Sequence, residues 1–531
     1  MHLVKAHLVL AFCHLGLTFP NNKATDPFEE LLSNPSSTGL NLLDISSADL
    51  EAQLQTLKAS SSLHGFSKCQ VACALLPLFA MTVSNSNSSG YEPLPYWSIQ
   101  QAEVKPGCRV DVSSAKDISN TVLISRLTQC PFAVKSGGHA AFAGASSIQD
   151  GMLINLAKLN MVSLSSDRTV TQVGPGNTWH DVYRQLDPLG VSVVGGREAG
   201  VGVGGLLLGG GISYFSGRFG WGCDNVVNYE VVLASGAIVN ASPTSHADLY
   251  WALRGGSGTN FGIVSRFDLA TFEQGLLWGG SKYYNADQNN KLVDAYTKFL
   301  TDAPTDNFAH LYVSYGYAAQ LGGFIGVAGP TYGKAIGNAT IFETLNKIPV
   351  LGDETGFASM GDLALALNQT TLARFKTVTF KNDPALFKGI VKIFTEEAST
   401  VLTVPGLAPF FAFQPISDNI VEHMQKNGGN ALGLSTADGP LTIMNLNWGW
   451  TNEVYDALVL ETVDRFVSRS VALAESKGLN HSFIYMNYAK LEQDVFGGYG
   501  AKNVARLKRI QHKFDPKGVF KSLQPGYFKL K

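Results

Sequence analysis

The sequence predicts an α+β protein with at least two domains. The chain has 531 residues, which is too long for a single compact core. Apolar residues make up 45% of it and charged residues 15%, a balance typical of globular proteins. Helix and strand patterns succeed each other up to about residue 273, and a second block of long helical patterns and aromatic strands follows.

The N-terminus has the pattern of a targeting segment. One lysine precedes a short apolar run from Leu8 to Phe19, whereas a membrane span needs about 20 apolar residues. We therefore expect residues 1–20 to be a secretory signal peptide, with a buried N-terminal helix as the alternative. Residues 21–91 are expected to form a polar N-terminal segment that contains an exposed loop at 84–90.

Sequons and cysteines also favour a secreted or secretory-pathway glycoprotein. The five N-x-S/T sequons are at Asn87, Asn240, Asn338, Asn368 and Asn480. The four cysteines that follow the signal peptide and precede the glycine-rich part are Cys69, Cys73, Cys108 and Cys130. They predict one or two disulfides, but four cysteines allow three pairings and the sequence does not choose among them. No second Cys or His pair gives them a zinc-site spacing, so no metal is expected.

Clear helix and strand signals begin near residue 114. Ser114 and Asp117 resemble a capping box in front of apolar positions at helical spacing. Residues 131–136 predict a buried strand that runs into glycines, and 168–174 predict another strand. A helix is expected at about 179–186.

A hairpin and a return of the chain complete the predicted order. Ser235-Gly236 between two apolar stretches indicates a β-hairpin, followed by a short helix at 247–253 and a strand at 263–272. Residues 274–479 are expected to form a second domain, a sheet backed by helices. The last residues, 480–531, are expected to rejoin the first domain with a strand at 482–490 and a basic amphipathic helix at 504–514.

Three glycine-rich stretches indicate a binding site for an anion. They occupy residues 136–144, 200–211 and 255–262, each after an apparent strand. Paired glycines accept positive φ and can expose successive N–H groups, which hold an anion without side-chain charge. Three such stretches in one domain favour a large dinucleotide with a pyrophosphate as the ligand.

Other nucleotide-binding and catalytic patterns fit less well. Gly200, Gly202 and Gly205 formally match G-x-G-x-x-G, and Asp224 follows at about the Rossmann distance. That fold needs a full helix after the glycines, and residues 209–211 are three glycines that would end it, at about 1 kcal/mol each relative to alanine. Walker A, G-x-S-x-G and H-E-x-x-H patterns are absent. The net charge of −2 gives no basic field for nucleic acid.

Together the motifs resemble those of the berberine-bridge-enzyme-like flavoproteins of the vanillyl-alcohol-oxidase superfamily. The strings that carry the resemblance are SGGHAAFAG, GVGVGGLLLGGG, DNV at 224–226, WALRGGSGTNFGIVSRF, YMNY and FDPKGVF, over residues 92–273 and 484–529. The resemblance implies a two-subdomain, PCMH-type FAD-binding domain over 92–273 and 480–531. Residues 274–479 would then be the α+β substrate domain.

The resemblance also implies a covalent flavin. His139 matches the histidine that is bonded to the 8α-methyl group of FAD in that family. Family members with two covalent flavin links have a cysteine, which forms the second link, where this chain has Glu198. A single histidyl link is therefore expected. Cys223 is expected to be a buried free thiol. Val203 matches a position thought to gate oxygen near the flavin, and valine there is compatible with an oxidase.

The expected site residues follow from the same motifs. The cofactor-binding set is Ser136, Gly137, Gly138, His139, Ala140, Gly144, Gly202, Gly204, Gly205, Gly209, Gly210, Asp224, Gly262, Val264 and Asn487. Relatives often use the tyrosine after this asparagine as a base, which gives Tyr488 the catalytic role. In a strand, Tyr485 and Asn487 would share one face and Tyr488 the other. Free tyrosine has a pKa near ~10, so the base would need a cation or hydrogen bonds that the sequence does not reveal.

The implied activity is FAD-dependent dehydrogenation of an alcohol, an amine or an activated C–H group, with O₂ as acceptor and H₂O₂ as product. Low charge and many aromatic residues favour a small, fairly apolar metabolite, such as a polyketide, alkaloid or terpenoid intermediate. The segment 447–450, Asn-Trp-Gly-Trp, either lines the substrate cavity with rings or belongs to the sheet core. The alternatives are a carbohydrate oxidase with a polar, Trp-lined groove, a dehydrogenase with another acceptor, and a non-catalytic glycoprotein with a flavin fold.

Overall fold

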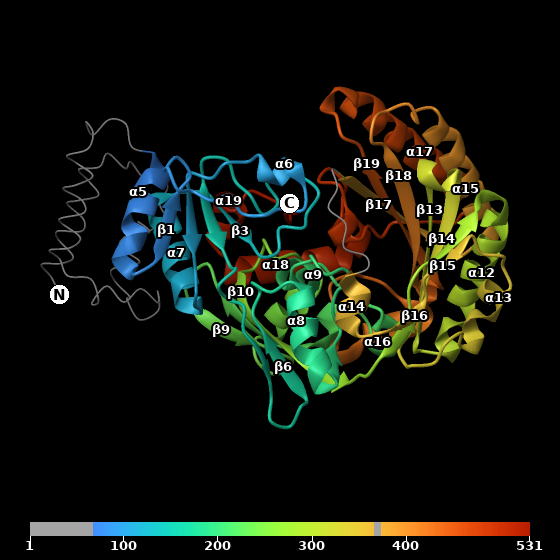
Figure 1. Cartoon of the computed structure of the whole chain (residues 1–531). Coiled ribbons are helices and arrows are strands. Elements are labelled where there is room, and N and C mark those ends of the chain that lie inside the picture. Colours follow the sequence, from blue (N-terminus) through green and yellow to red (C-terminus); the bar gives the residue numbers. More distant parts are fainter. Residues whose placement is uncertain (1–66, 366–372) are drawn as a thin grey trace, which may run out of the picture.

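The computed structural model describes residues 67–365 and 373–531. The predicted signal peptide, residues 21–66 of the predicted N-terminal segment and the sequon at Asn368 lie outside the described residues. In the described part the strands form three sheets, with four, six and ten strands (Figure 1). The predicted α+β class is therefore confirmed.

The four-stranded sheet has the order β1-β2-β4-β3. Its strands are β1 (Thr82–Asn85), β2 (Cys108–Asp111), β3 (Phe132–Lys135) and β4 (Met152–Asn155). β4 pairs in parallel with β2 and β3, and β1 is antiparallel to β2. Helix α7 (Ala115–Thr128) begins at the predicted capping box, in which Ser114 and Asp117 exchange side-chain to backbone hydrogen bonds.

Two disulfides join helix α5 (Lys68–Leu75) to this sheet. Cys69 is bonded to Cys130, the second residue before β3, and Cys73 to Cys108, the first residue of β2. The structure thus selects one of the three possible pairings. Cys223 is a buried free thiol, as the sequence predicts.

The six-stranded sheet has the order β5-β6-β10-β8-β9, and β7 also pairs with β10. Its strands are β5 (Val162–Leu164), β6 (Val170–Val173), β7 (Val191–Val193), β8 (Val226–Val232), β9 (Ile238–Ala241) and β10 (Ile263–Glu273). The predicted hairpin is confirmed, because β8 pairs with β9 across Gly236, whose φ is +83°. The predicted helices α8 (Trp179–Leu186), α11 (Ala247–Leu253) and α18 (Ala501–Phe514) are also present, and α18 packs on α11.

The ten-stranded sheet is antiparallel throughout and follows the order β15-β12-β14-β13-β18-β19-β17-β20, with β11 paired to β14 and β16 paired to β11. Its strands are β11 (Leu277–Gly279), β12 (Lys282–Asn285), β13 (Ala309–Ala318), β14 (Gly323–Tyr332), β15 (Gly352–Asp353), β16 (Gly356–Ala358), β17 (Ala373–Lys381), β18 (Ala408–Ile416), β19 (Leu441–Gly449) and β20 (Asn480–His481). Helices α12 (Asn289–Asp302), α13 (Glu343–Asn346), α15 (Pro384–Ser399) and α17 (Asp456–Ser476) cover one face, on the right in Figure 1. The other face is turned toward the rest of the molecule.

The strands of this sheet have two different faces because side chains alternate along a strand. On β18, Phe411 and Phe413 are buried in the core beneath the helices. Phe410, Ala412 and Gln414 point to the opposite side and line a cavity there. The alternation therefore turns this face toward the cavity and, at Ile416 and Ile443, toward the core that the sheet shares with the six-stranded sheet.

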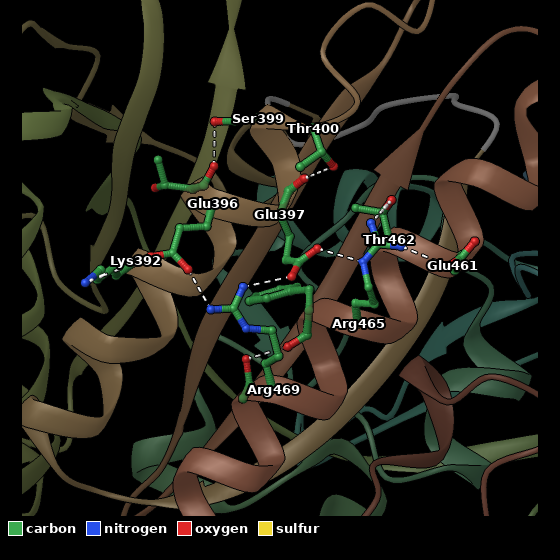
Figure 2. Close-up of polar contacts among 12 residues, drawn as sticks. Lys392, Glu396, Glu397, Ser399, Thr400, Glu461, Thr462, Arg465 and Arg469 are labelled. Carbon is green, nitrogen blue, oxygen red and sulfur yellow. Dashed lines mark hydrogen bonds and ion pairs between the residues drawn. The ribbon is translucent and has the colours of Figure 1, made fainter.

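An ion-pair network holds α15 to α17 on the outer side (Figure 2). The buried carboxylate of Glu397 accepts hydrogen bonds from Nε of Arg465 at 3.0 Å and from Nη1 of Arg469 at 2.8 Å. Nη2 of Arg469 also donates to Glu396 at 2.6 Å. The network fixes the helical layer that supports the sheet.

The predicted strand at 482–490 is wrong. After the two-residue β20, the chain leaves the sheet and makes a 3₁₀ turn at Met486–Tyr488. Here tertiary contacts override strand propensity, because Tyr485 and Asn487 bind the second glycine stretch instead of a neighbouring strand.

The remaining helices are short. They are α6 (Ile99–Ala102), α9 (Val203–Leu208), α10 (Ser216–Phe219), α14 (Met360–Leu365), α16 (Asp418–His423) and α19 (Val519–Leu523). Helix α9 has six residues and ends at Gly209, as expected from the glycine triplet, so it is no Rossmann helix. None of the helices within 67–365 and 373–531 is long and apolar enough to cross a bilayer.

Candidate active site

A cavity of about 750 Å³ lies between the glycine-rich stretches and the uncovered face of the ten-stranded sheet. All three glycine stretches contribute to its wall, together with β13, β14, β18, β19 and the segment 485–489. The cavity therefore brings together parts of the chain that are far apart in sequence. The described residues contain no group of three or more His, Cys, Asp or Glu side chains that could hold a metal ion.

Most of the expected site residues lie at this cavity. Those in its wall are Ser136, Gly137, Gly138, His139, Ala140, Gly202, Gly204, Gly205, Val264, Asn487 and Tyr488. Five others do not line it: Gly144, Gly209, Gly210, Asp224 and Gly262. Val203, the expected oxygen gate, is fully buried and also lies outside the wall.

Three of the five outlying residues allow close packing behind the wall. A Cβ at Gly209 would collide with the side-chain amide of Asn487. Gly210 has a φ of +127°, and a Cβ there would press on Trp221 and Tyr485. A Cβ at Gly262 would lie 2.8 Å from the carbonyl oxygen of Val232. These glycines shape the site indirectly.

Asp224 and Gly144 have local roles. The buried carboxylate of Asp224 accepts hydrogen bonds from the backbone N–H of Trp221 at 2.9 Å and from Nδ2 of Asn430 at 2.8 Å. Burial raises its pKa. Gly144 has a φ of +81° and donates its N–H to Oγ of Ser147. Neither residue reaches the cavity wall.

The first two glycine stretches touch through their main chains. A Cβ on Gly137 would collide with Gly202, and a Cβ on Gly202 would collide with the backbone nitrogen of Gly137. Oγ of Ser136 donates to the carbonyl of Pro175 at 2.5 Å and accepts the N–H of Gly204 at 3.3 Å. This part of the cavity, formed by residues 136–144 and 200–211, is thus a wall of bare backbone that a bulky anionic ligand can approach closely. We call it the glycine wall.

Gln101 holds the loop that carries His139, a role that the sequence did not reveal. Its fully buried amide donates to the carbonyl of Ala140 at 2.7 Å, and its Oε1 accepts the N–H and the hydroxyl of Ser146, both at 2.8 Å. The short helix α6 that carries Gln101 has no distinguishing pattern.

The imidazole of His139 is fixed but keeps an unsatisfied nitrogen. Its ring stacks on Trp97 with centroids 4.8 Å apart, and Trp97 in turn stacks on Phe375. Nε2 is buried and makes no hydrogen bond, although Oε1 of Glu198 lies 3.4 Å away. The ring is therefore held by stacking, and the carboxylate of Glu198 stands beside its unpaired nitrogen.

Arg197 connects Tyr488 to the sheet. Its Nη2 donates to Oη of Tyr488 at 2.9 Å and to Oε1 of Gln414 at 2.6 Å. Its Nη1 lies 3.2 Å from Nε2 of His310. Oη of Tyr488 is also 3.2 Å from Oε1 of Gln414. The sequence did not predict a role for Arg197, Gln414 or His310. It singled out only Glu198, the residue that follows Arg197.

The electrostatics of this group follow from burial. Burial, and then the charge of Arg197, lower the pKa of His310 well below its usual value, so His310 is neutral and accepts from Arg197. Burial raises the pKa of Tyr485, whose hydroxyl accepts the N–H of Gly211 at 3.0 Å. The two neighbouring tyrosines therefore differ, because Tyr485 is hydrogen-bonded to the second glycine stretch and Tyr488 to the guanidinium of Arg197.

The sheet face of the cavity carries both rings and polar groups. Its aromatic side chains are Tyr283, Tyr312, Phe375 and Phe410, and its polar ones are Ser281, Ser314, Gln320, Gln414, Asn445 and Asn447. Oδ1 of Asn445 is buried without a hydrogen-bond partner. Trp448 and Trp450 belong to the core on the other side, so the interpretation of these rings as cavity lining is wrong.

The residues present fit a flavin dinucleotide. Bare amides line one part of the cavity, where a Cβ on Gly137 or Gly202 would collide with backbone, and the imidazole of His139 lines the cavity beside them. The volume lies within the range of about 300–1,000 Å³ that is usual for small-molecule and cofactor sites. Thr259 and Val264, from the third glycine stretch and β10, continue the same wall.

Comparison with known families agrees with this fit. A model described as FAD binding domain matches residues 106–242, and a model described as Berberine and berberine like matches residues 484–525. An FAD-dependent monooxygenase, tpcD, of Cochliobolus heterostrophus is 39% identical over 511 residues, which cover 91% of this chain and 98% of the relative. The FAD-dependent monooxygenase prx3 of Penicillium roqueforti is 34% identical over 82% of this chain and 88% of its own.

Solved structures share the fold at lower identity. BBE-like 1 from Physcomitrella patens superposes with a TM-score of 0.70 at 18% identity, over 88% of this chain and all of the other. Xylooligosaccharide oxidase from Myceliophthora thermophila superposes with a TM-score of 0.70 at 21% identity, over 85% and 98% of the two chains.

Proposed function

The chain belongs to the berberine bridge enzyme-like FAD-linked oxidoreductases, and we propose that it dehydrogenates a small, neutral, fairly apolar metabolite with Tyr488 as the base. The group oxidised would be an alcohol, an amine or an activated C–H. The observation that carries the proposal is the hydrogen bond of 2.9 Å between the guanidinium of Arg197 and Oη of Tyr488 at the cavity wall.

The glycine wall would bind the cofactor. The main-chain amides of the first two glycine stretches would hold the diphosphate, and Ser136 would keep the stretches together through its bonds to Pro175 and Gly204. His139 would carry the flavin as a single histidyl link, because Glu198 stands where a second, cysteinyl link would need a thiol. FAD bound here supplies the two-electron acceptor.

Tyr488 would take the proton from the substrate heteroatom onto Oη. A tyrosine needs help for this at neutral pH, since its ordinary pKa is near ~10. Arg197 provides a charge at 2.9 Å, and its other hydrogen-bond partners in the described chain, Gln414 and neutral His310, carry no negative charge. Negative charge that develops on Oη of Tyr488 during proton transfer would therefore meet this cation directly.

The sheet face would orient the substrate. Rings of Tyr312, Phe375 and Phe410 offer apolar contact, while the unpartnered Oδ1 of Asn445 can accept a hydrogen bond from a hydroxyl or amine. No carboxylate or lysine from the sheet lines the described cavity, which supports a neutral substrate.

Among the alternatives, a carbohydrate oxidase is less supported. The expected Trp-lined groove is missing, because no tryptophan of residues 67–365 or 373–531 lines the cavity. The relatives named monooxygenases raise a second possibility, in which O₂ is consumed and one of its atoms enters the product. We propose O₂ as the acceptor in either case.

We also propose that the protein is secreted or lies in the lumen of the secretory pathway. The disulfides Cys69–Cys130 and Cys73–Cys108 support an oxidising compartment.

The test uses the purified protein, its flavin spectrum and an oxygen electrode. A panel of neutral alcohols and amines is screened for substrate-dependent O₂ uptake, and H₂O₂ is measured in parallel. One H₂O₂ per O₂ supports an oxidase, whereas O₂ uptake without H₂O₂ supports a monooxygenase. Tyr488→Phe should retain FAD and lose activity about 10²–10⁴-fold, the usual contribution of a general base. Full activity of this variant would contradict the assigned base, and a protein unable to hold FAD would contradict the whole proposal.

A further inference from the structure

We propose that Glu198 is the proton acceptor for the covalent attachment of FAD to His139, so that this chain completes its own flavin link. The inference rests on the proposed histidyl link and assigns a chemical role to the position where bicovalent relatives have a cysteine. It concerns the maturation of the enzyme and is separate from the dehydrogenation of substrate.

The two side chains are placed for a proton transfer. Oε1 of Glu198 lies 3.4 Å from Nε2 of His139, and Nε2 is the buried ring nitrogen that lacks any hydrogen bond. The carboxylate has no other hydrogen bond or ion pair within the described chain. A small rotation of either side chain would bring the two atoms to hydrogen-bonding distance.

The neighbouring backbone holds Glu198 in position. The carbonyl of Glu198 accepts the N–H of Val201 at 3.3 Å, and the N–H of Ala199 donates to the carbonyl of Ala364 at 3.2 Å. The carbonyls of Ala199 and Val201 accept the N–H groups of His180 and Trp179 at the start of α8. The carboxylate is therefore carried by a fixed segment.

The ring of His139 is held as well. It stacks on Trp97 at a centroid distance of 4.8 Å, and the N–H of Trp97 donates to the carbonyl of Gly138 at 3.1 Å. With Nε2 turned to Glu198, Nδ1 is the nitrogen left to form the link. A carboxylate that accepts from one imidazole nitrogen also makes the other more nucleophilic.

The reaction balances with dioxygen as the oxidant. Nδ1 of His139 would form a bond to the 8α carbon of FAD, and that carbon would release one hydrogen as a proton to water. Alkylation makes the ring cationic while Nε2 still holds its original proton, and Nε2 passes this proton to Glu198. The two electrons of the broken C–H bond remain on the flavin, and O₂ takes them up with two protons, equal in number to those released by the carbon and by Nε2, to give H₂O₂. The side chain of Glu198 is 29% exposed, so its proton can leave to water.

The experiment measures attachment and not turnover. Wild type, Glu198→Gln, Glu198→Asp and Glu198→Ala are incubated with FAD in air, and samples are precipitated in acid over time. Flavin in the pellet is covalent, and flavin in the supernatant is only bound. We expect E198Q to retain bound FAD and to attach it about 100-fold more slowly than wild type, since the amide cannot accept the proton. E198D should be intermediate, and formate should restore part of the rate in E198A.

Controls and contrary outcomes separate the two proposals. Glu343→Gln, an exposed glutamate paired with Lys347 on the helical layer, should behave as wild type. Attachment in E198Q at the wild-type rate overturns the role of Glu198 alone. A wild-type pellet without flavin overturns the histidyl link and this inference, while FAD in the supernatant still supports the dehydrogenase. If E198Q does not fold, the absence of formate rescue in E198A overturns the inference.

Discussion

Nη2 of Arg197 donates a hydrogen bond of 2.9 Å to Oη of Tyr488, although 291 positions separate the two residues in sequence. Arg197 follows β7 and precedes α9, whereas Tyr488 ends a 3₁₀ turn near the C-terminal part of the chain. Gln414 on β18 binds both of them, so the segment before the second glycine stretch, the turn that carries Tyr488 and the sheet meet at one point. The cation that a tyrosine base requires thus comes from the residue next to Glu198.

Replacing Arg197 should slow turnover through Tyr488. Arg197→Met removes the charge, and we expect kcat to fall about 10²–10³-fold, the usual cost of losing one electrostatic stabiliser. Arg197→Lys keeps a charge but loses the second hydrogen bond, so its kcat should lie between those of wild type and R197M. Steady-state kinetics of the flavin-loaded proteins check this.

A merely structural role for Arg197 would give a different result. R197M would then lose stability, its flavin would dissociate more readily, and the kcat of the molecules that keep their flavin would match that of wild type.

His139→Ala should move the flavin from the acid pellet to the supernatant. The glycine wall does not involve the imidazole, so we expect the variant to retain bound FAD. Turnover should fall on the order of tenfold, the equivalent of about 1.4 kcal/mol, because an electron-withdrawing tether makes the flavin a better oxidant. Peptide mass analysis of wild type should place the adduct on the peptide that contains His139. His512→Ala on α18 is the control, and an unchanged yellow pellet from H139A would contradict the link.

The contact between the first two glycine stretches predicts that alanine substitutions at two nearby glycines change thermal stability in opposite directions. Gly202→Ala puts a Cβ against the backbone nitrogen of Gly137, and because backbone cannot move aside cheaply, the thermal midpoint should fall. Gly205→Ala, on α9, meets nothing within 4 Å and should stabilise the helix by up to about 1 kcal/mol. Thermal unfolding of the apoproteins compares the two, and equal midpoints would contradict the tight contact.

Local patterns in the sequence predicted the parts of the fold that depend on neighbouring residues. The capping box at Ser114 and the hairpin at Gly236 were of this kind, because their hydrogen bonds span a few residues. The glycine stretches also indicated a nucleotide site, since bare backbone is recognisable wherever it lies in the chain. The prediction of a strand at 482–490 was wrong, because Tyr485 and Asn487 form hydrogen bonds with the second glycine stretch and not with another strand.

The polar partners of Tyr488 could not be predicted for the same physical reason. Arg197, Gln414 and His310 come from three separate elements, and only the packing of the sheet against the glycine stretches brings them together. The expected separation of Tyr485 and Tyr488 on opposite faces of a strand is only partly seen. Tyr485 and Asn487 contact each other and Tyr488 reaches Arg197, but the rings of Tyr485 and Tyr488 also pack edge to face with centroids 4.8 Å apart, because the segment is a 3₁₀ turn.

The lowered pKa of Lys529 predicts that the free energy of unfolding rises with pH. Its Nζ donates to the carbonyl of Thr259, a cavity residue, at 2.6 Å, and to that of Phe520 at 3.1 Å. Burial lowers its pKa to about 7, against a smaller opposite effect of Asp515. Below pH 7 both the folded and the unfolded chain hold the proton. Between pH 7 and about 10.4, the ordinary lysine value, the folded chain binds fewer protons, so the free energy of unfolding rises with pH.

The difference between wild type and Lys529→Met isolates this effect. Other groups that titrate in the same range, such as Lys135 with its pKa lowered by burial to about 8, are present in both proteins and cancel. Relative to the variant, wild type should gain about 2 kcal/mol between pH 7 and 9 in urea unfolding. Lys502→Met, at an exposed position, should show no such trend. A wild-type to K529M difference that stays constant across this range would mean that Lys529 keeps its proton in the folded protein, and the ammonium would then be the form that fastens the C-terminus to the third glycine stretch.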